Sequence, residues 1–266
     1  MPKQPPVIAL LTDFGARDHY VGAMKGVILS VCPNVRIIDL SHEVGPQGVA
    51  EAAYLLWASY AYLPFGTIVL VVVDPGVGTS RGIMMVKSIR NVFVAPDNGV
   101  LDYVLWQEKA VEVFALNENS RFLQGILPRK RSSTFHGRDV FAPLAAHIAG
   151  GAPLPQLGRK APRAKVREPF VSRLDSSVEP KILHIDRFGN IITNILQPEE
   201  DSPPFIAGIT IGRKVIDRWI KSYEEAPPES PCLIVGSSGL IEIVVNKNSA
   251  AAILSLSHRS SLRLIA

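Results

Sequence analysis

An apolar segment that ends in a carboxylate and two glycines is the feature that most constrains the fold of this chain. Residues 67–73 read Thr-Ile-Val-Leu-Val-Val-Val and run into Asp74-Pro-Gly-Val-Gly, with Arg81 close behind. A continuous apolar run of this kind is typical of a strand buried on both faces of a parallel sheet. Ligands of open α/β sheets bind beyond the carboxyl ends of the strands. The segment therefore predicts a sheet that presents Asp74 to a ligand.

A second segment of the same kind lies near the amino terminus. Residues 7–11 are apolar throughout, and Thr12-Asp13-Phe14-Gly15 follow them. Two strand-end aspartates in one sheet suggest a single site, because the carboxyl ends of parallel strands meet at one edge.

The composition is that of a globular protein with one large or two modest domains. The chain has 266 residues, of which 47% are hydrophobic and 20% charged,. No apolar run is long enough for a membrane helix, and the first residues show no signal-peptide pattern,. The two cysteines, Cys32 and Cys232, lack metal-binding spacing. We expect a reduced, cytoplasmic protein that does not bind membranes.

The net charge of +4 comes from local basic segments, residues 129–131 and 159–167. No aromatic residues interleave with these charges, and no nucleic-acid-binding motif accompanies them,. A solvated loop and a linker are therefore expected here, and no nucleic-acid partner.

Strands and helices alternate in the first part of the chain. The strands are expected at Val7–Thr12, Val35–Leu40, Thr67–Val73, Gly82–Lys87, Asn91–Ala95 and Ala110–Leu116. Apolar residues recur with helical spacing over residues 21–31, where Asp18 suits an N-cap and Pro33 a stop,. Residues 49–60 and 139–148 predict two more helices. This order implies an α/β domain with a mostly parallel sheet covered by helices, residues 1–157.

The composition of the sequence changes after residue 157. Residues 158–180 are basic, contain prolines and lack apolar periodicity, so we expect a linker,. After it the strands are expected at Lys181–Ile185, Ile191–Ile195, Ile206–Ile211, Cys232–Val235, Leu240–Val245, Ala251–Leu256 and Leu262–Ile265. They predict a smaller antiparallel, barrel-like domain over residues 181–266.

Several polar groups are candidates for chemistry, each with a structural alternative. Asp74, Arg81 and His136 together could bind and orient a water, or form an ion pair beside an unrelated loop histidine. Asp13 could accept hydrogen bonds from ribose hydroxyls, or cap a turn. Residues 186–190 offer an acid, an aromatic ring and an amide, but Gly-Asn also favours a hairpin turn,.

The remaining patterns are weaker. Gly236-Ser-Ser-Gly239 is a generic hairpin sequence when taken alone. The chain has no phosphate-binding loop, no zinc-type spacing and no nucleophile-elbow serine,. No ligand spacing supports a metal site at Asp18, His19, Asp74 or His136.

Taken together and in order, these groups resemble the S-adenosylmethionine hydrolases, also called S-adenosylmethionine hydroxide adenosyltransferases, which are relatives of fluorinating and chlorinating enzymes. The matching segments are Thr12-Asp13-Phe14-Gly15, Asp18-x-Tyr20-Val21-Gly22-x-x-Lys25-Gly26, Val73-Asp74-Pro75-Gly76-Val77-Gly78 with Arg81, Ala95-Pro96-Asp97-Asn98-Gly99, Phe135-His136-Gly137-Arg138-Asp139, Asp186-x-Phe188-Gly189-Asn190 and Ser237-x-Gly239. The ordered set is far more specific than any one segment.

The resemblance implies a homotrimer. Each ligand would lie between the amino-terminal domain of one subunit and the carboxy-terminal domain of its neighbour. The implied reaction is displacement at C5′ of the adenosyl group, which yields adenosine and methionine when water is the nucleophile. S-adenosylmethionine is then the substrate, and no cofactor or metal is implied.

The resemblance also implies roles for single residues. Asp74, Arg81 and His136 would hold the attacking water. The other implied contacts are Asp13 with the ribose hydroxyls, Asp186 with the methionine ammonium, Phe188 and Asn190 with adenine, and Ser237 with the methionine carboxylate. Tyr20 and Glu242 complete the expected substrate-binding set, and Ser238 stands where halogenating relatives carry arginine.

Three other functions compete with hydrolysis. A halogenase would carry an uncharged residue in place of Asp74 and a long insertion in place of the short turn at residues 87–91. A non-catalytic adenosyl-binding protein would not need Asp74, Arg81 and His136 together. A metal-dependent phosphatase or nuclease using the aspartates is the third alternative.

Overall fold

The computed structural model describes residues 4–117, 119–173, 177–197, 204–256 and 260–265. The chain divides into two compact units, residues 1–166 and 167–266, which are described separately. Residues 174–176 of the predicted linker lie outside the described residues.

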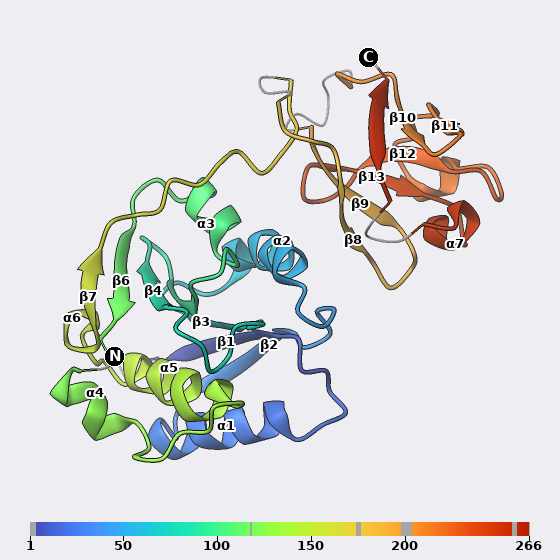
Figure 1. The fold of residues 1–266 in the computed structure, drawn as a ribbon. Coiled ribbons are helices and arrows are strands. Elements are labelled where there is room, and N and C mark those ends of the chain that lie inside the picture. Colours follow the sequence, from blue (N-terminus) through green and yellow to red (C-terminus); the bar gives the residue numbers. More distant parts are fainter. Residues whose placement is uncertain (1–3, 118, 174–176, 198–203, 257–259, 266) are drawn as a thin grey trace. The chain divides into compact units, whose positions relative to one another are not determined.

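A seven-stranded sheet forms the centre of the amino-terminal unit, in the order β2-β1-β3-β5-β4-β6-β7 (Figure 1). Its strands are β1 Val7–Thr12, β2 Arg36–Ser41, β3 Ile68–Val72, β4 Ile83–Lys87, β5 Val92–Pro96, β6 Glu112–Leu116 and β7 Gly158–Ala161. The four strands β2, β1, β3 and β5 pair in parallel, whereas β4 and β7 run against their neighbours. The predicted α/β class with a mostly parallel sheet is confirmed.

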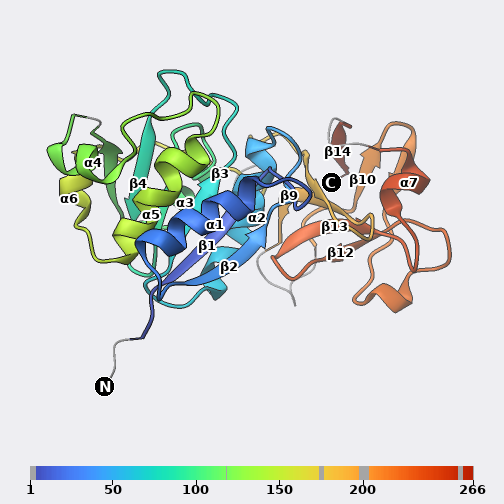
Figure 2. The same ribbon diagram turned by 90° about the horizontal axis from the view of Figure 1, so that it is seen from below.

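Helices cover both faces of this sheet, as Figures 1 and 2 show. They are α1 Tyr20–Val31, α2 Val49–Ser59, η1 Tyr60–Tyr62, α3 Asp102–Gln107, α4 Arg121–Ile126, η2 Gly137–Phe141, α5 Ala142–Ala149 and α6 Leu154–Leu157. Successive strand residues point to opposite faces. Ile8 and Leu10 of β1 accordingly belong to the core beneath α1 and α5, whereas Ala9 and Leu11 belong to the core beneath α2 and α3.

Strand β3 shows why residues 67–73 are apolar without interruption. It lies between β1 and β5 in the parallel part of the sheet, and all five of its residues are buried. Leu70 and Val72 face one core, and Val69 and Val71 face the other. Because neither face meets water, the chain needs no polar side chain until it reaches Asp74, two residues after the end of β3,.

Two local predictions are wrong in this unit. Asp18 does not cap α1; the helix begins at Tyr20 and His19 occupies the N-cap position without a side-chain hydrogen bond. The first residues of the predicted linker form β7, which pairs with β6 at the edge of the sheet. The sequence did not predict this strand, because its residues Arg159 and Lys160 are exposed and charged and give no apolar alternation. Edge strands commonly carry such charges.

The carboxy-terminal unit contains two antiparallel sheets. One has the order β12-β13-β9-β8 and the other β11-β10-β14. Their elements are β8 Ile182–Ile185, β9 Ile191–Leu196, β10 Gly208–Ile211, β11 Lys214–Ile216, η3 Tyr223–Glu225, β12 Cys232–Val235, β13 Leu240–Val244, α7 Ala250–Leu254 and β14 Leu262–Ile265. Among the described residues these sheets do not close into a barrel, so the antiparallel architecture is confirmed and the barrel-like form is not.

The strand predicted at Ala251–Leu256 is also wrong, because these residues lie largely in helix α7. Ser249 caps the helix by accepting a hydrogen bond from the backbone N–H of Ala252, at 3.0 Å. Ser255 ends it in a left-handed conformation, with φ of 55°. A serine cap followed by three alanines favours a helix, which a reading of apolar residues alone overlooks,.

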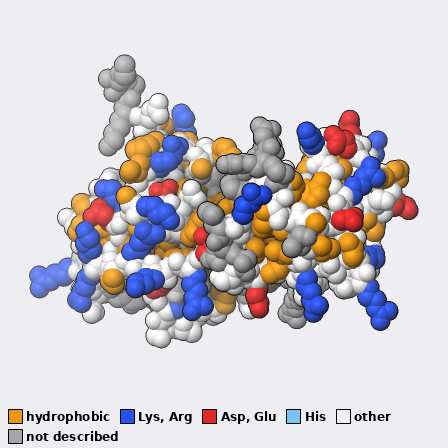
Figure 3. Space-filling view, turned by 90° about the horizontal axis from the view of Figure 1, so that it is seen from above, with side chains coloured by type: hydrophobic (Ala, Val, Ile, Leu, Met, Phe, Trp, Pro, Cys, Tyr) orange, Lys and Arg blue, Asp and Glu red, His pale blue; other side chains and the backbone are white. Residues whose placement is uncertain are grey.

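One of the basic residues after β7 makes hydrogen bonds within the amino-terminal unit. Arg163 donates hydrogen bonds to the carbonyls of Lys109, at 3.0 Å, and Leu105. On the face drawn in Figure 3, Lys and Arg side chains are separated by neutral and apolar atoms. No helix in the described ranges is long and apolar enough to cross a membrane.

Gly158 offers a test of how tightly β7 packs. A Cβ atom there would lie 2.5 Å from the carbonyl oxygen of Ala115 and 2.7 Å from Cε of Met85. Gly158→Ala should therefore lower the free energy of unfolding by roughly 1–3 kcal/mol in denaturant titrations. Gly125→Ala is the matched control, because that helical glycine has nothing within 4 Å; it should raise stability by up to about 1 kcal/mol. Equal effects of the two substitutions would contradict the packing.

Candidate active site

The candidate site of the amino-terminal unit lies beyond the carboxyl ends of β1 and β3. Asp13 directly follows β1, and Asp74 lies two residues after the end of β3. Both line a cavity of about 220 Å³, as does His136. The other lining residues are Phe14, Gln47, Val72, Pro75, Val77, Thr134, Phe135 and Gly137. The prediction that the two strand-end aspartates share one site agrees with this arrangement.

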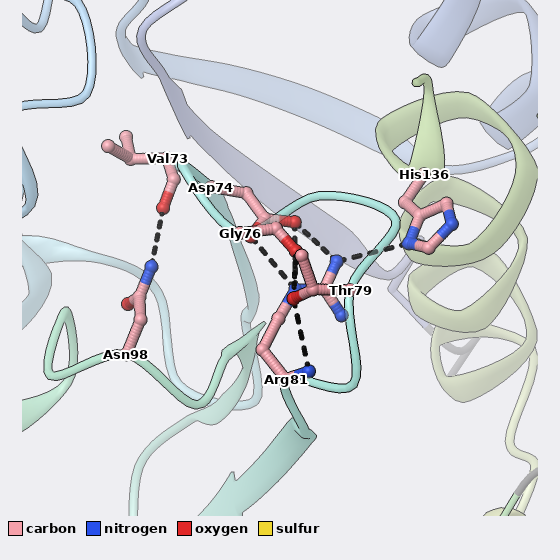
Figure 4. Close-up of polar contacts among 7 residues, drawn as sticks. All are labelled: Val73, Asp74, Gly76, Thr79, Arg81, Asn98 and His136. Carbon is pink, nitrogen blue, oxygen red and sulfur yellow. Dashed lines mark hydrogen bonds and ion pairs between the residues drawn. The ribbon is translucent and has the colours of Figure 1, made fainter. Parts of the chain in front are cut away.

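Asp74, Arg81 and His136 form one hydrogen-bonded cluster (Figure 4). Nε of Arg81 donates to both carboxylate oxygens of Asp74, at 2.8 and 3.0 Å, and its Nη2 forms an ion pair with Oδ2. The same Nη2 donates to Nδ1 of His136 at 3.1 Å. The side chains of Asp74 and Arg81 are only 5% and 11% exposed. The ion pair between Asp74 and Arg81 and the side chain of His136 thus belong to one hydrogen-bonded cluster, and His136 is not an unrelated loop histidine.

The direction of the last hydrogen bond determines the tautomer of His136. A guanidinium group has donors and no acceptor. Nδ1 of His136 must therefore accept from Arg81, and a neutral imidazole then carries its proton on Nε2,.

The loop between β3 and β4 folds back to bring Arg81 to Asp74. Val77 N–H donates to the Asp74 carbonyl at 3.1 Å, and Oγ1 of Thr79 donates to the Gly76 carbonyl at 2.7 Å. Gly78 has φ of 78°, and a Cβ there would lie 2.4 Å from the carbonyl oxygen of Ser133. This position therefore requires glycine, both for the backbone angle and for the close approach of the next loop.

The side-chain amide of Asn98 fixes the backbone at the strand end before Asp74. Nδ2 of Asn98 donates to the carbonyl of Val73 at 2.9 Å (Figure 4). Its Oδ1 accepts from Val100 N–H at 3.2 Å. This anchors the residue before Asp74 to the loop after β5.

His136 sits at the start of η2, a short π-helical segment that leads into α5. Asp139 within it is buried, accepts hydrogen bonds from Arg138 at 2.6 and 2.9 Å, and accepts one from Ser132 N–H at 2.7 Å. The Arg138 guanidinium beside it keeps the pKa of Asp139 below its ordinary value. π-Helical turns are frequent at functional sites, and this one holds the loop that carries His136.

Asp13 lies on the other side of the cavity. Its Oδ2 accepts from Gln47 N–H at 2.9 Å. A chain of polar contacts supports the strand end beside it: Thr12 Oγ1 is 2.9 Å from His42 Nδ1, and His42 Nε2 is 3.0 Å from Oδ1 of the exposed Asp39. One carboxylate oxygen of Asp13 therefore accepts a backbone hydrogen bond, and the strand end that carries Asp13 is held by side-chain contacts.

Tyr20 is the first residue of α1 and belongs to an aromatic cluster. Its ring centroid is 5.1 Å from that of Phe135 and 5.6 Å from that of Phe14. Phe14 and Phe135 line the cavity, but Tyr20 is not among the described residues that do. Both phenylalanines lie inside the sequence motifs, although we did not predict them as site residues.

In the carboxy-terminal unit, residues 186–190 form the turn between β8 and β9. Oδ1 of Asp186 accepts from the N–H groups of Phe188, at 2.9 Å, and Asn190, at 2.8 Å. Oδ2 accepts from Nδ2 of Asn190 at 2.9 Å, and Gly189 adopts φ of 83°. The hairpin interpretation is confirmed, and the turn also presents its polar groups together.

This turn borders a second cavity, of about 600 Å³, within the carboxy-terminal unit. It is lined by Asp186, Phe188, Asn190, Tyr223, Val245, Lys247, Asn248 and Ser249. Phe188 is 77% exposed, so its ring is accessible for stacking with a planar ligand,. Sequence reasoning missed Tyr223 and Lys247, because neither lies in a motif.

Ser237 and Glu242 belong to the neighbouring hairpin. Ser237 is exposed in the turn between β12 and β13, where Gly239 has φ of 77°. Glu242 lies within β13 and is only 8% exposed, and its Oε2 accepts from the hydroxyl of Tyr223 at 3.4 Å. Neither residue is among the described residues that line the second cavity. The structure thus brings together Asp13, Asp74, Arg81 and His136 in one unit and Asp186, Phe188 and Asn190 in the other, whereas Tyr20, Ser237 and Glu242 lie outside both sets of cavity-lining residues. Across the described ranges, no three His, Cys, Asp or Glu side chains converge as a metal site.

Comparison with known proteins identifies the family. The profile of the SAM hydroxide adenosyltransferase N-terminal domain matches residues 8–158, and that of the C-terminal domain matches residues 180–263. A protein of Thermus thermophilus named (R)-S-adenosyl-L-methionine hydrolase is 37% identical over 97% of this chain and 99% of its own. A fluorinase of Actinoplanes is 28% identical over 71% of this chain and 72% of its own.

A solved structure shares the fold as well. The crystal structure of an uncharacterized conserved protein from Thermotoga maritima superposes with a TM-score of 0.82 at 33% identity, covering 97% of this chain and 100% of that one. The resemblance predicted from the ordered motifs is confirmed over both units. The chain belongs to the SAM hydroxide adenosyltransferase family.

Proposed function

We propose that this protein hydrolyses S-adenosylmethionine to adenosine and methionine, with water attacking C5′ of the adenosyl group. The observation that supports this most directly is the buried cluster of Asp74, Arg81 and His136 at a cavity that Asp13 also lines. Full-length relatives bear the name (R)-S-adenosyl-L-methionine hydrolase.

The chemistry needs little more than alignment. The sulfonium is already a good leaving group, so methionine needs no general acid. The protein must hold water in line with the C5′–S bond and exclude other solvent. Alignment of this kind is worth on the order of 7–11 kcal/mol.

Within this proposal each residue of the cluster has a distinct part. Arg81 clamps Asp74 through two donors, so the carboxylate cannot rotate,. Asp74 accepts an O–H of the water and leaves an oxygen lone pair directed at C5′. His136 borders the same cavity from the opposite loop and is held by Arg81.

Asp74 also favours hydrolysis over halogenation. A carboxylate repels an incoming halide, most strongly in a site that excludes water. Residues 87–91 form a tight turn between β4 and β5, in which Ser88 N–H donates to the Asn91 carbonyl at 2.9 Å. The long insertion expected of a halogenating relative is therefore absent from this turn, all of whose residues the structure describes.

The proposal extends to the binding residues and the assembly. Asp13 would bind the ribose, Phe188 and Asn190 the adenine, and Asp186 and Ser237 the amino-acid end, with Tyr20 and Glu242 in support. No cofactor is needed. Because these residues divide between two units, a homotrimer with sites shared between subunits is proposed. Cys32 and Cys232 are free thiols, which supports the proposed reduced, cytoplasmic location,.

The nucleophile is tested by isotope labelling. The purified protein should form adenosine from S-adenosylmethionine, and in water enriched in oxygen-18 the label should appear at O5′ of adenosine by mass spectrometry. Activity should persist with a chelator, which separates this reaction from metal-dependent hydrolysis. Formation of unlabelled adenosine would contradict attack by water. Formation of 5′-chloroadenosine in millimolar chloride would show that the protein is a halogenase.

Asp74→Asn tests the assigned role of the carboxylate. Loss of the negative charge that strengthens the hydrogen bond to water should lower kcat roughly 10²- to 10⁴-fold. Calorimetry with a non-reacting adenosyl ligand should give a dissociation constant close to that of the parent. Glu112→Gln is the control, because Glu112 pairs with Lys160 on the surface at 3.1 Å and should leave both quantities unchanged. Wild-type turnover in Asp74→Asn would show that the role is wrong.

Shared sites predict complementation between two inactive variants. Asp74→Asn damages the amino-terminal half and Asp186→Ala the carboxy-terminal half. If each site combines halves from two subunits, unfolding and refolding an equimolar mixture should leave about one quarter of the sites intact. Activity should rise accordingly, and light scattering should give the mass of a trimer. An inactive mixture of well-folded trimers would rule out shared sites.

A further inference from the structure

His42 is a buried histidine close to the candidate active site. It is only 8% exposed and directly follows β2, at the start of the loop that leads to α2. It is not among the described residues that line the cavity of about 220 Å³. Any part that His42 plays in this site must therefore act through other residues.

Two contacts join His42 to the residues on either side of Asp13. Nδ1 of His42 lies 2.9 Å from Oγ1 of Thr12, a fully buried residue. The carbonyl of His42 accepts from Gly15 N–H at 2.6 Å. Oγ1 of Thr12 also accepts from Phe14 N–H at 3.3 Å. The backbone before and after Asp13 is therefore connected to His42, either directly or through the hydroxyl of Thr12.

The far end of the same loop contacts Asp13 itself. Oδ2 of Asp13 accepts from Gln47 N–H at 2.9 Å, and Gln47 has a φ of 63°, which is uncommon for a residue other than glycine,. Gly45 N–H donates to Oε2 of Glu51 at 2.9 Å, which fastens the loop to the first turn of α2. Within the part of the chain that the structure describes, no hydrogen bond reaches Oδ1 of Asp13. The loop thus uses one oxygen of the carboxylate and leaves the other for a ligand.

The two ring nitrogens of His42 lie in different surroundings. Nε2 lies 3.0 Å from Oδ1 of Asp39, whose Oδ2 accepts from Nζ of Lys25 at 2.7 Å. The side chains of Lys25 and Asp39 are 32% and 43% exposed, so water weakens the interactions on this side,. The contact of Nδ1 with Thr12 is buried and is not weakened in this way,. Of the two, the contact with Thr12 is the one that can fix the strand end.

We propose that His42 is a positioning residue that gives Asp13 its selectivity for the two hydroxyls of a ribose. This inference rests on the proposed function, which assigns the ribose to Asp13. A carboxylate selects a pair of hydroxyls when its oxygens are fixed in direction, whereas a mobile carboxylate is satisfied equally well by water. Gln47 N–H fixes the carboxylate, and His42 fixes the backbone that carries it through Thr12.

Adenosine and 2′,3′-dideoxyadenosine test the inference, because they differ only in the two hydroxyls. Calorimetry on the full-length protein gives both dissociation constants, and their ratio measures the selectivity for the hydroxyls. Hydrogen bonds to a charged group should make the wild-type ratio roughly 10 to 100 in favour of adenosine. A loss of folded protein or of contacts with adenine weakens both ligands alike and leaves the ratio unchanged.

Two substitutions of His42 separate its two contacts. The amide of asparagine reaches the place of Nδ1, so His42→Asn keeps a partner for Thr12 and should retain most of the ratio. The amide of glutamine reaches the place of Nε2, so His42→Gln faces Asp39 and should lower the ratio roughly 10-fold. Thr12→Val removes only the hydroxyl and should lower the ratio to the same extent, and the double variant should lower it no further. His147→Gln is the matched control, because His147 lies in α5 and lines a different cavity.

Any of three results would overturn the inference. They are a wild type that does not prefer adenosine, a wild-type ratio in His42→Gln or Thr12→Val, and equal ratios in His42→Asn and His42→Gln, which would show that the imidazole only fills space. Adenosine formation from S-adenosylmethionine by the wild type is assayed separately. If adenosine forms and the ratio does not respond to His42, only the inference fails. If no adenosine forms, the proposed reaction fails, and the ratios still decide the inference, because calorimetry needs no turnover.

Discussion

The ion pair between Asp74 and Arg81 is the interaction around which the amino-terminal half of the site is organised. Two charges this deeply buried are tolerated only with good geometry, and removing one partner of such a pair typically costs about 3–5 kcal/mol,. The glycine turn that returns Arg81 to Asp74, and the Asn98 bond to the strand end, both serve this geometry. The third partner of Arg81 is His136, so one guanidinium aligns two groups that border the cavity.

The sheet explains why the cluster forms at this place. β1 and β3 are adjacent and parallel, so Asp13 and Asp74 emerge at the same edge. Both faces of β3 are covered, and its buried residues hold the strand end rigidly below the cavity. A rigid base matters, because a reaction that relies on alignment loses rate with small displacements.

The carboxy-terminal half is built on a different principle. The Asp186 carboxylate is held by three hydrogen bonds from its own turn, two from backbone N–H groups and one from Nδ2 of Asn190. Among the residues that the structure describes, Glu242 accepts a side-chain hydrogen bond only from the hydroxyl of Tyr223. Its raised pKa means that the neutral form stabilises the fold at low pH, and that this contribution is lost as the pH rises through the folded-state value,. Such an acid weakens stability at neutral pH, a pattern expected where function competes with stability.

Some of this was predictable from the sequence alone. The uninterrupted apolar run before Asp74 predicts a doubly covered parallel strand, and the two strand-end aspartates predict a common edge, because strand periodicity and sheet topology are local and regular. The ordered motifs identified the family over both units. The errors occur where a local signal is weak or misleading: charged β7 resembles a linker, and α7 depends on a single serine cap.

Only the tertiary structure decided how the site residues meet. Arg81 and His136 are 55 positions apart, and no spacing rule reveals that one donates to the other. Tyr223 lies outside every motif yet contacts Glu242 from 19 positions away. Burial of Glu242, and its lack of a basic partner in the described ranges, follow from the packing of β9, β12 and β13. Periodicity reports which face a residue occupies, whereas charge and hydrogen-bond partners depend on long-range packing that no local pattern encodes.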